Sequence, residues 1–308
     1  MPAQPHEPHE SHESMTVRIA TRGTPLARWQ AERVASLLAT DTEIVIVTTT
    51  GDARPDTPIR EMGGTGVFVK EVERALLDGH ADVAVHSAKD LPSQPPPDGL
   101  LLAAFPERAD VRDALVGSTL AGLRPDATVA TGSVRRRAQL AAVHGTLEFA
   151  ELRGSIATRL EKASDYDAIV VAAAALERLG LLDRADELLS PEVMIPQVGQ
   201  GALAVECRAN DDATLALVTA INDPAVARAV SAERSFLAGL GGGCDLPCGA
   251  LAVHDGEELV LQGMISSLDG RTVLRGNERG DDPEHLGRVL VRELLEHGGR
   301  ELIEQAQR

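Results

Sequence analysis

From Val17 onward the chain alternates between short runs rich in β-branched residues and amphipathic stretches with the period of an α-helix. The first series of predicted elements comprises strand 17–20, helix 25–39, strand 43–49, helix 67–77, strand 82–86 and strand 100–105. The second series comprises strand 128–130, helix 134–143, strand 147–152, helix 156–162 and strand 168–172. Strands that alternate with helices form α/β units with largely parallel sheets. The alternation therefore predicts an α/β fold.

The pattern changes in the last third of the chain. The elements predicted there are strand 201–207, helices 213–221 and 225–240, strands 250–254, 258–263 and 272–275, and a final helix over 283–305. Tight turns such as Asp255-Gly256 separate the last three strands. This order indicates an antiparallel sheet flanked by helices, and hence a separate α+β domain. Residues 1–14 are polar, lack apolar periodicity and are expected to be disordered.

Composition limits the classes of function. The formal charge of −17 argues against a nucleic-acid-binding surface, which would need a basic face. The longest apolar run, 169–176, is too short to cross a bilayer, and no secretory signal pattern opens the chain. Three cysteines cannot form a disulfide framework, which fits a reducing compartment. We therefore expect a cytoplasmic protein that binds neither nucleic acid nor membrane.

The first group of residues that could carry chemistry is the segment 86–92, His-Ser-Ala-Lys-Asp-Leu-Pro. It follows a predicted strand at its carboxyl end, where open α/β sheets place their ligand sites. Asp90 could be a functional carboxylate there, or it could only cap the segment that contains Pro92. Position alone does not separate these two interpretations.

The second group consists of hydroxyl and basic residues that follow predicted strands. Its members are Thr131, Ser133, Arg135 and Arg136, then Arg153 and Arg159, and in the first series Arg22. Helix N-terminal N–H groups, hydroxyls and guanidinium groups together bind anions. Consecutive arginines point in different directions around a helix, so they cannot all face one ligand. The repetition favours anion binding over a solvated basic face.

The third group is a glycine-rich loop around Cys244. Three glycines, 241–243, give the backbone at Cys244 unusual freedom and accessibility. The thiol could be a nucleophile, a metal ligand, an attachment point or an inert loop cysteine. Cys244 and Cys248 could bind zinc only with two further ligands, and no second pair has suitable spacing, so no metal is expected.

Together these groups resemble the porphobilinogen deaminase family. The motifs that carry the resemblance, in order along the chain, are R-x-[ST]-P-L-A at 22–27, G-T-G-x-F-x-K-E at 64–71, H-S-x-K-D-L-P at 86–92, L-R-G-x-x-x-T-R-L at 152–160, R-L-G-L at 178–181, V-G-Q-G-A at 198–202, E-C-R at 206–208 and G-G-C-x-x-P-x-G at 242–249. Order and spacing fit from Val17 to the C-terminus, and only the tail lies outside the resemblance.

The resemblance implies two type II periplasmic-binding-protein-like α/β domains with a cleft between them, and a smaller C-terminal α+β domain. The chain then crosses between the first two domains twice. The implied boundaries are a disordered tail at 1–14, domain 1 at 15–105 plus 203–222, domain 2 at 106–202, and domain 3 at 223–308.

The resemblance also implies an activity and a cofactor. Cys244 would carry one covalent dipyrromethane per chain, and four porphobilinogen molecules would condense on it head to tail, each losing ammonia. Water would then release hydroxymethylbilane. Asp90 is the expected catalytic residue, because a carboxylate stabilises the cationic pyrroles and can relay protons. The small-molecule substrate would be bound by a monomer.

Each pyrrole carries an acetate and a propionate, which are costly to bury unpaired. The residues that the resemblance assigns to the cofactor are Cys244, Lys89, Ser87, Arg135, Arg136, Thr131, Ser133 and Arg153. Those assigned to the substrate are Arg22, Thr24, Arg159, Arg178 and Gln200. We expect Arg135→Leu to impair chain initiation or elongation and to leave the fold intact.

Some residues depart from the family pattern. Glu61 and Thr65 stand in a lid-like loop where many members have lysines, Cys248 replaces an apolar residue, and Arg137 adds a third arginine. Two other functions remain open at this point. A two-lobed anion-binding module would leave Asp90 and Cys244 unexplained, and a thiol enzyme would need His86 or His254 as base.

Overall fold

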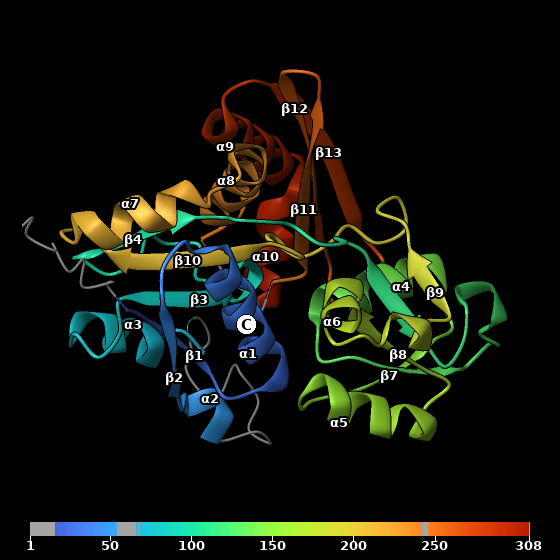
Figure 1. Ribbon diagram of the computed structural model, residues 1–308. Helices are drawn as coiled ribbons and strands as arrows, with labels where there is room; N and C mark the ends of the chain where they lie inside the picture. Colours follow the sequence, from blue (N-terminus) through green and yellow to red (C-terminus); the bar gives the residue numbers. More distant parts are fainter. Residues whose placement is uncertain (1–15, 54–65, 67, 242–245, 308) are drawn as a thin grey trace, which may run out of the picture.

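The computed structural model describes residues 16–53, 66, 68–241 and 246–307 (Figure 1). The predicted tail, the lid-like loop with Glu61 and Thr65, and Cys244 lie outside the described residues. The described chain forms three sheets, which define a first lobe, a second lobe and a C-terminal unit. In Figure 1 the two lobes lie side by side, and the C-terminal unit lies above them.

The first lobe is built on a five-stranded sheet of order β2-β1-β3-β10-β4. Its strands are β1 (Val17–Arg22), β2 (Thr42–Val47), β3 (Val83–Ser87), β4 (Leu100–Ala104) and β10 (Leu203–Arg208). Strand β1 pairs in parallel with β2 and β3, whereas β10 is antiparallel to both β3 and β4. The chain therefore leaves this sheet after β4 and returns to it at β10.

The second lobe repeats this arrangement, with strand order β7-β6-β8-β5-β9. Its strands are β5 (Asp113–Val116), β6 (Thr128–Ala130), β7 (Glu148–Ala150), β8 (Ala168–Ala172) and β9 (Glu187–Leu189). Here β6 is parallel to β7 and β8, and the reversed strand is β5. The two matching sheets, with a smaller third unit, confirm the predicted fold class.

The expectation of largely parallel sheets needs one correction. Four strands of each sheet run in the same direction, but the fourth in spatial order is reversed, so half of the pairings are antiparallel. Strands β5 and β9 were not predicted from the sequence. They span four and three residues, too few to show a period.

Helices cover these sheets. Their bounds are α1 (Pro25–Leu37), α2 (Thr50–Ala53), α3 (Lys70–Leu77), α4 (Val134–Val143), α5 (Ile156–Glu161), α6 (Ala173–Arg178), α7 (Asp212–Ala220), α8 (Pro224–Gly239), α9 (Pro283–Leu294) and α10 (Arg300–Ala306). Helix α1 begins where Thr24 accepts a hydrogen bond from the Ala27 N–H, and α4 begins where Ser133 accepts one from the Arg136 N–H. Both caps follow a strand, so they place polar groups at the sheet edge that faces the site.

The C-terminal unit is an antiparallel sheet, β11 (Cys248–Asp255), β12 (Glu258–Ser266) and β13 (Val273–Gly280), packed against α8 and α9. Its core contains the fully buried side chains of Phe236, Leu259 and Leu261. The predicted single helix over 283–305 is interrupted. Gly298 has a φ of 105°, outside the right-handed helical region, so α9 ends and α10 begins after a wide turn at Leu295–Gly299.

Within the described part of the chain, no helix combines the length and the apolar composition that crossing a membrane requires.

Candidate active site

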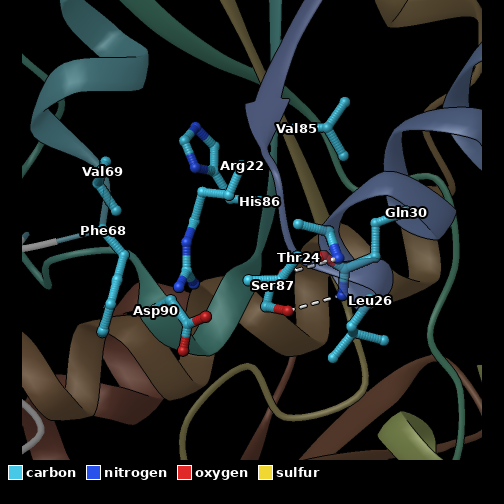
Figure 2. A pocket seen from close by; sticks show the side chains of 11 residues that line it. Arg22, Thr24, Leu26, Gln30, Phe68, Val69, Val85, His86, Ser87 and Asp90 are labelled. Carbon is cyan, nitrogen blue, oxygen red and sulfur yellow. Dashed lines mark hydrogen bonds between the residues drawn. The ribbon is translucent and has the colours of Figure 1, made fainter. Parts of the chain in front are cut away.

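The centre of the site is the end of β3. This strand ends at Ser87, and one 3-10 turn (Ala88–Asp90) follows it. Asp90 and Ser87 line a cavity of about 50 Å³ together with Arg22, the last residue of β1, and Thr24, which follows that strand (Figure 2). Strands β1 and β3 are parallel neighbours, so their carboxyl ends meet at one edge of the sheet. The structure thus brings together four of the residues singled out in the sequence.

Three local contacts fix the wall of this cavity. The Gln30 amide donates a 2.7 Å hydrogen bond to the Ser87 hydroxyl, and Gln30 is buried. The Arg22 guanidinium lies 4.0 Å from the centroid of the Phe68 ring. Figure 2 shows the Arg22 side chain running toward the Asp90 carboxylate. The carboxylate therefore shares its cavity with a positioned cation and a positioned hydroxyl.

The second lobe contributes further cations to the surroundings of Asp90. Arg159 lies within electrostatic range of Asp90, Arg136 and Arg153. Burial and then the charge of Arg136 lower the pKa of Arg159 to about 10, although Asp90 opposes this. Arg159 of α5 is thus close both to a carboxylate of the first lobe, Asp90, and to two other cations of the second lobe, Arg136 and Arg153. Such an arrangement can bind a polyanion between the lobes.

Lys89 lies next to Asp90 and is affected by the same charges. Burial, followed by the charge of Arg136, lowers the pKa of Lys89 to about 8, whereas Asp90 and Asp113 raise it. Its Nζ lies 3.5 Å from Oε1 of Gln200. The segment 195–202 returns the chain to the first lobe, and we call it the return crossover. It therefore reaches the turn at Ala88–Asp90.

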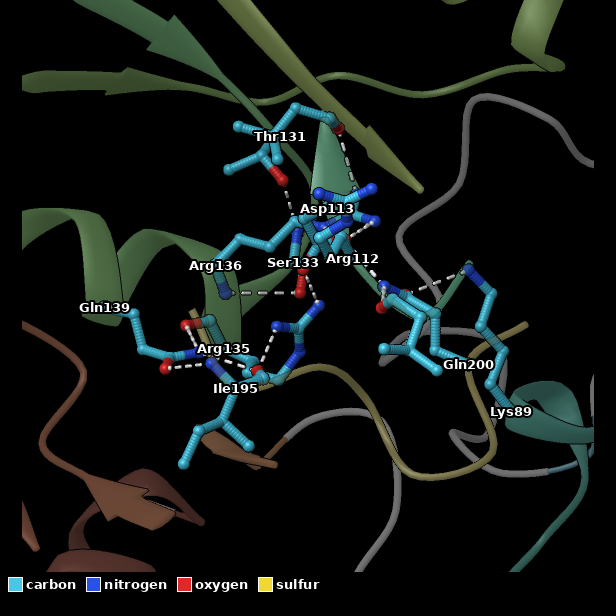
Figure 3. A network of polar contacts seen from close by, with 12 residues as sticks. Lys89, Arg112, Asp113, Thr131, Ser133, Arg135, Arg136, Gln139, Ile195 and Gln200 are labelled. Carbon is cyan, nitrogen blue, oxygen red and sulfur yellow. Dashed lines mark hydrogen bonds and ion pairs between the residues drawn. The ribbon is translucent and has the colours of Figure 1, made fainter. Parts of the chain in front are cut away.

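The two arginines at the start of α4 are occupied by a protein carboxylate (Figure 3). Arg135 donates to Asp113 at 2.8 Å, and Arg136 donates to it through Nε at 3.0 Å and through Nη2 at 2.7 Å. Arg135 is 2% exposed, Arg136 6% and Asp113 0%. The predicted intact fold of Arg135→Leu is therefore revised, because the substitution would break a buried ion pair.

The remaining predicted residues fall in several places. Thr131 is buried and its hydroxyl accepts a hydrogen bond from the Ser133 N–H at 3.2 Å. Gln200 is fully buried, and its amide donates to the Val111 carbonyl and to Asp113. Arg178 donates to the Gly201 carbonyl at 2.7 Å and lies 5.5 Å from the Trp29 ring centroid. Gln200 thus contacts the segment that leads from the first lobe into the second, and Arg178 contacts the return crossover. Neither residue lines the cavity at Asp90.

The sequence interpretation missed two pairs of ionisable side chains that lie largely inside the protein. His86 lines the cavity and its Nε2 lies 3.0 Å from Oε2 of Glu206, although the angle is not that of a hydrogen bond. Arg108 pairs with Glu233 at 2.7 Å, and Glu233 is fully buried. Glu206 belongs to the E-C-R motif at 206–208, so the sequence singles out this residue but not its partner. Nothing in the sequence marks Arg108 or Glu233.

The described cysteines are unlike a reactive thiol. Cys207 and Cys248 are buried, and burial raises the pKa of the Cys207 thiol to about 11. Cys244 lies outside the described residues. Strand β11, which comes next in the chain, lies against the return crossover. A Cβ at Gly249 of β11 would stand 2.6 Å from the Pro196 carbonyl oxygen and 3.1 Å from Arg135 Cδ. His254, the other base considered, contacts the Ala225 carbonyl at 2.9 Å.

The residues present fit a group that carries several carboxylates. Lys89, Arg136, Arg153 and Arg159 share one electrostatic neighbourhood with Asp90. The Nε of Arg135 is buried and has no hydrogen-bond partner among the described residues. Guanidinium groups bind carboxylates with two parallel hydrogen bonds, so this donor set suits an anionic ligand. No group of three or more His, Cys, Asp or Glu side chains in the described ranges could hold a metal ion.

Comparison with known proteins places the chain in a family. Residues 17–216 match the family model described as porphobilinogen deaminase, dipyrromethane cofactor binding domain, and residues 227–296 match its C-terminal domain. The porphobilinogen deaminase of Roseiflexus castenholzii is 48% identical over 300 residues, covering 94% of this chain and 98% of the relative. That of Acidithiobacillus ferrooxidans is 44% identical, covering 94% and 97%.

Among solved structures, the GluR0 ligand-binding core in complex with L-glutamate is similar to 68% of this chain and 91% of its own, at 11% identity and a TM-score of 0.40. The two family models between them span most of the chain, and the relatives match nearly its whole length. This chain belongs to the porphobilinogen deaminase family.

Proposed function

We propose that this chain performs the porphobilinogen deaminase reaction in the cavity at Asp90, with a dipyrromethane attached to Cys244. Four porphobilinogen molecules are joined head to tail with loss of ammonia, and water releases hydroxymethylbilane. One observation carries the proposal. A carboxylate of the first lobe, Asp90, shares its electrostatic surroundings with Arg136 and Arg159 of the second lobe.

The role proposed for Asp90 follows from the charges of the reaction. Positive charge develops on a pyrrole ring when ammonia leaves, and a ring carbon must lose a proton after the new carbon–carbon bond forms. The Asp90 carboxylate lines the cavity in which a ring would be bound, so its oxygens can stabilise that charge and accept the proton. Arg22 lines the same cavity, and we expect its guanidinium to bind a substrate carboxylate there.

The basic residues divide between the two bound groups. We assign Lys89, Ser87, Arg135, Arg136, Thr131, Ser133 and Arg153 to the cofactor side. We assign Arg22, Thr24, Arg159, Arg178 and Gln200 to the substrate side. Arg178 acts there through its contact with the Gly201 carbonyl, and Gln200 acts through its contact with Asp113. When bound, the dipyrromethane supplies the electron-rich pyrrole to which the first substrate is joined, and it stays with the enzyme after product release.

Asp90→Asn tests this assignment. Loss of a general acid–base group typically costs about 10²–10⁴ in rate, so ammonia release from porphobilinogen should fall by that factor while the urea unfolding midpoint is unchanged. The matched control is Asp98→Asn, an exposed aspartate in the loop before β4. Equal rates for the two variants would rule out Asp90 as the catalytic carboxylate.

We further propose that the protein is a monomer and acts in the cytoplasm. We also propose that it does not bind nucleic acid, which the net charge of −17 supports. We propose domain boundaries at 15–105 plus 203–222, 106–202 and 223–308. The return of β10 to the first sheet supports the discontinuous first domain.

A further inference from the structure

Asp113 is the first residue of β5, the reversed strand of the second lobe. It is 0% exposed and pairs with Ala172 of β8 and with Leu189 of β9. Its backbone is therefore fixed on both sides by neighbouring strands. A carboxylate in such a place is costly unless it is ion-paired and hydrogen-bonded.

Four hydrogen bonds reach the two oxygens of Asp113 (Figure 3). Oδ2 accepts from Nη2 of Arg135 at 2.8 Å. Oδ1 accepts from Nε and Nη2 of Arg136 and, at 2.9 Å, from Nε2 of Gln200. Burial alone would raise the pKa of Asp113, but Arg135 and Arg136 hold it far below its usual range. The two arginines thus favour the ionised form of this carboxylate.

Gln200 extends these contacts to the other lobe. Its Nε2 also donates to the Val111 carbonyl at 2.8 Å, and its Oε1 faces Nζ of Lys89 at 3.5 Å. With both ends of the amide occupied, Gln200 has one orientation. A single buried carboxylate of the second lobe is therefore connected through one side chain to the lysine beside Asp90.

The charges do not balance, which distinguishes this cluster from a core ion pair. Asp113 and, beside Lys89, Asp90 contribute two negative charges, whereas Arg135, Arg136 and Lys89 are three cations in their vicinity. The donors of Arg135 are not all used either, since its Nε has no hydrogen-bond partner among the residues described. One carboxylate thus fixes the geometry of these cations and leaves a net positive charge for a ligand.

We propose that Asp113 is a positioning residue of the deaminase reaction, which orients Arg136 and, through Gln200, sets Lys89 beside Asp90. This inference rests on the proposed function, because it assumes that Lys89 and Arg136 face carboxylates of the cofactor or substrate. Asp113 itself touches neither.

Asp113→Asn is the direct test, with Asp110→Asn as its matched control. Asp110 lies three residues earlier and also pairs with an arginine, Arg112, at 2.6 Å, but the pair is partly exposed and does not reach Lys89. Each protein is incubated with porphobilinogen, and the fraction of chains that carry the dipyrromethane is followed by intact mass. The urea unfolding midpoint and the pH dependence of ammonia release are measured in parallel.

The expected result for Asp113→Asn is at least a tenfold slower formation of the adduct. The pH above which the rate of ammonia release falls should also be lower in this variant. The charged groups around Lys89 are Arg136, Arg135, Asp90 and Asp113, and removing the negative charge of Asp113 leaves the neighbouring arginines to disfavour the lysine cation. Asp110→Asn should match the wild type in both measurements. A folded Asp113→Asn protein with the rate and pH limb of this control would overturn the proposal.

Should Asp113→Asn not fold, Gln200→Met decides the question. It cuts the connection to Lys89 and leaves the ion pairs of Asp113 in place. A several-fold slower adduct formation supports the positioning role, and an unchanged rate contradicts it. Wild-type protein that forms no adduct and releases no ammonia would instead refute the proposed function, so the two failures are distinguishable.

Discussion

At the scale of single residues, burial divides the basic groups of the site into two kinds. Arg135 and Arg136 are almost fully buried and donate to Asp113, so their removal affects folding as well as binding. Arg153 and Arg159 are partly exposed and lie around Asp90, so they can meet a ligand that enters from solvent. Substitutions in the two sets should therefore give different combinations of stability and activity.

Arg135→Leu belongs to the first kind. Breaking a buried ion pair by removing one partner costs about 3–5 kcal/mol, and we expect a loss of that size in the free energy of unfolding. Urea titration measures it. The control is Arg124→Leu, whose pair with Asp167 has an arginine side chain that is 68% exposed and should contribute less than about 1 kcal/mol. Equal stability of the two variants would show that the Asp113 pair is not needed for folding.

Lys89 should set the basic limit of activity. Burial and then Arg136 lower its pKa to about 8, so the cation is lost as the pH rises through that value. Because a carboxylate binds the protonated amine, kcat/KM should fall above about pH 8. Lys89→Arg keeps its charge far beyond this range and should remove the fall between pH 8 and 10. If kcat/KM of Lys89→Arg still falls near pH 8, a group other than Lys89 causes the fall.

At the scale of elements, the return crossover positions the turn at Ala88–Asp90. Gly199 has a φ of 71°, and a Cβ there would lie 3.0 Å from Ala88, so this position needs glycine. Gln197 donates to the Lys89 carbonyl at 3.1 Å. Glu233 of α8 accepts from the Gly199 N–H at 2.8 Å and from the Ala252 N–H of β11 at 2.9 Å. One helix residue thus connects the crossover, the C-terminal unit and Arg108.

Glu233→Gln tests this connection. The amide nitrogen would face N–H groups that now donate to the carboxylate, and the half-buried Arg108 would lose its charged partner. We expect a loss of about 3–5 kcal/mol in stability, measured by urea unfolding. Glu284→Gln, which removes an exposed pair with Arg288, should cost less than about 0.5 kcal/mol. A Glu233 variant as stable as this control would mean that the crossover is held by other contacts.

At the scale of the whole molecule, the sequence predicted what depends on local pattern. Helix α4 and strands β6 and β8 have the predicted bounds. Helix α4 has a helical period and the Ser133 cap, β8 is a continuous apolar run, and the three-residue β6 could be located because the start of α4 follows it. The motif residues Arg22, Thr24, Ser87 and Asp90 do meet in one cavity. What could not be predicted depends on pairing between distant segments. Strand β5 is too short to detect, and the partners of Asp113 and Glu233 lie 19 to 125 residues away.

The proposed reaction needs a dipyrromethane carried by Cys244 beside Asp90, and intact-mass spectrometry of the purified chain shows whether that group is present. We expect one dipyrromethane per chain in the wild type, none in Cys244→Ser, and full modification in Cys248→Ala, whose cysteine is buried in β11. Wild-type protein that turns over porphobilinogen without any covalent adduct would contradict this expectation, as would an adduct that survives in Cys244→Ser.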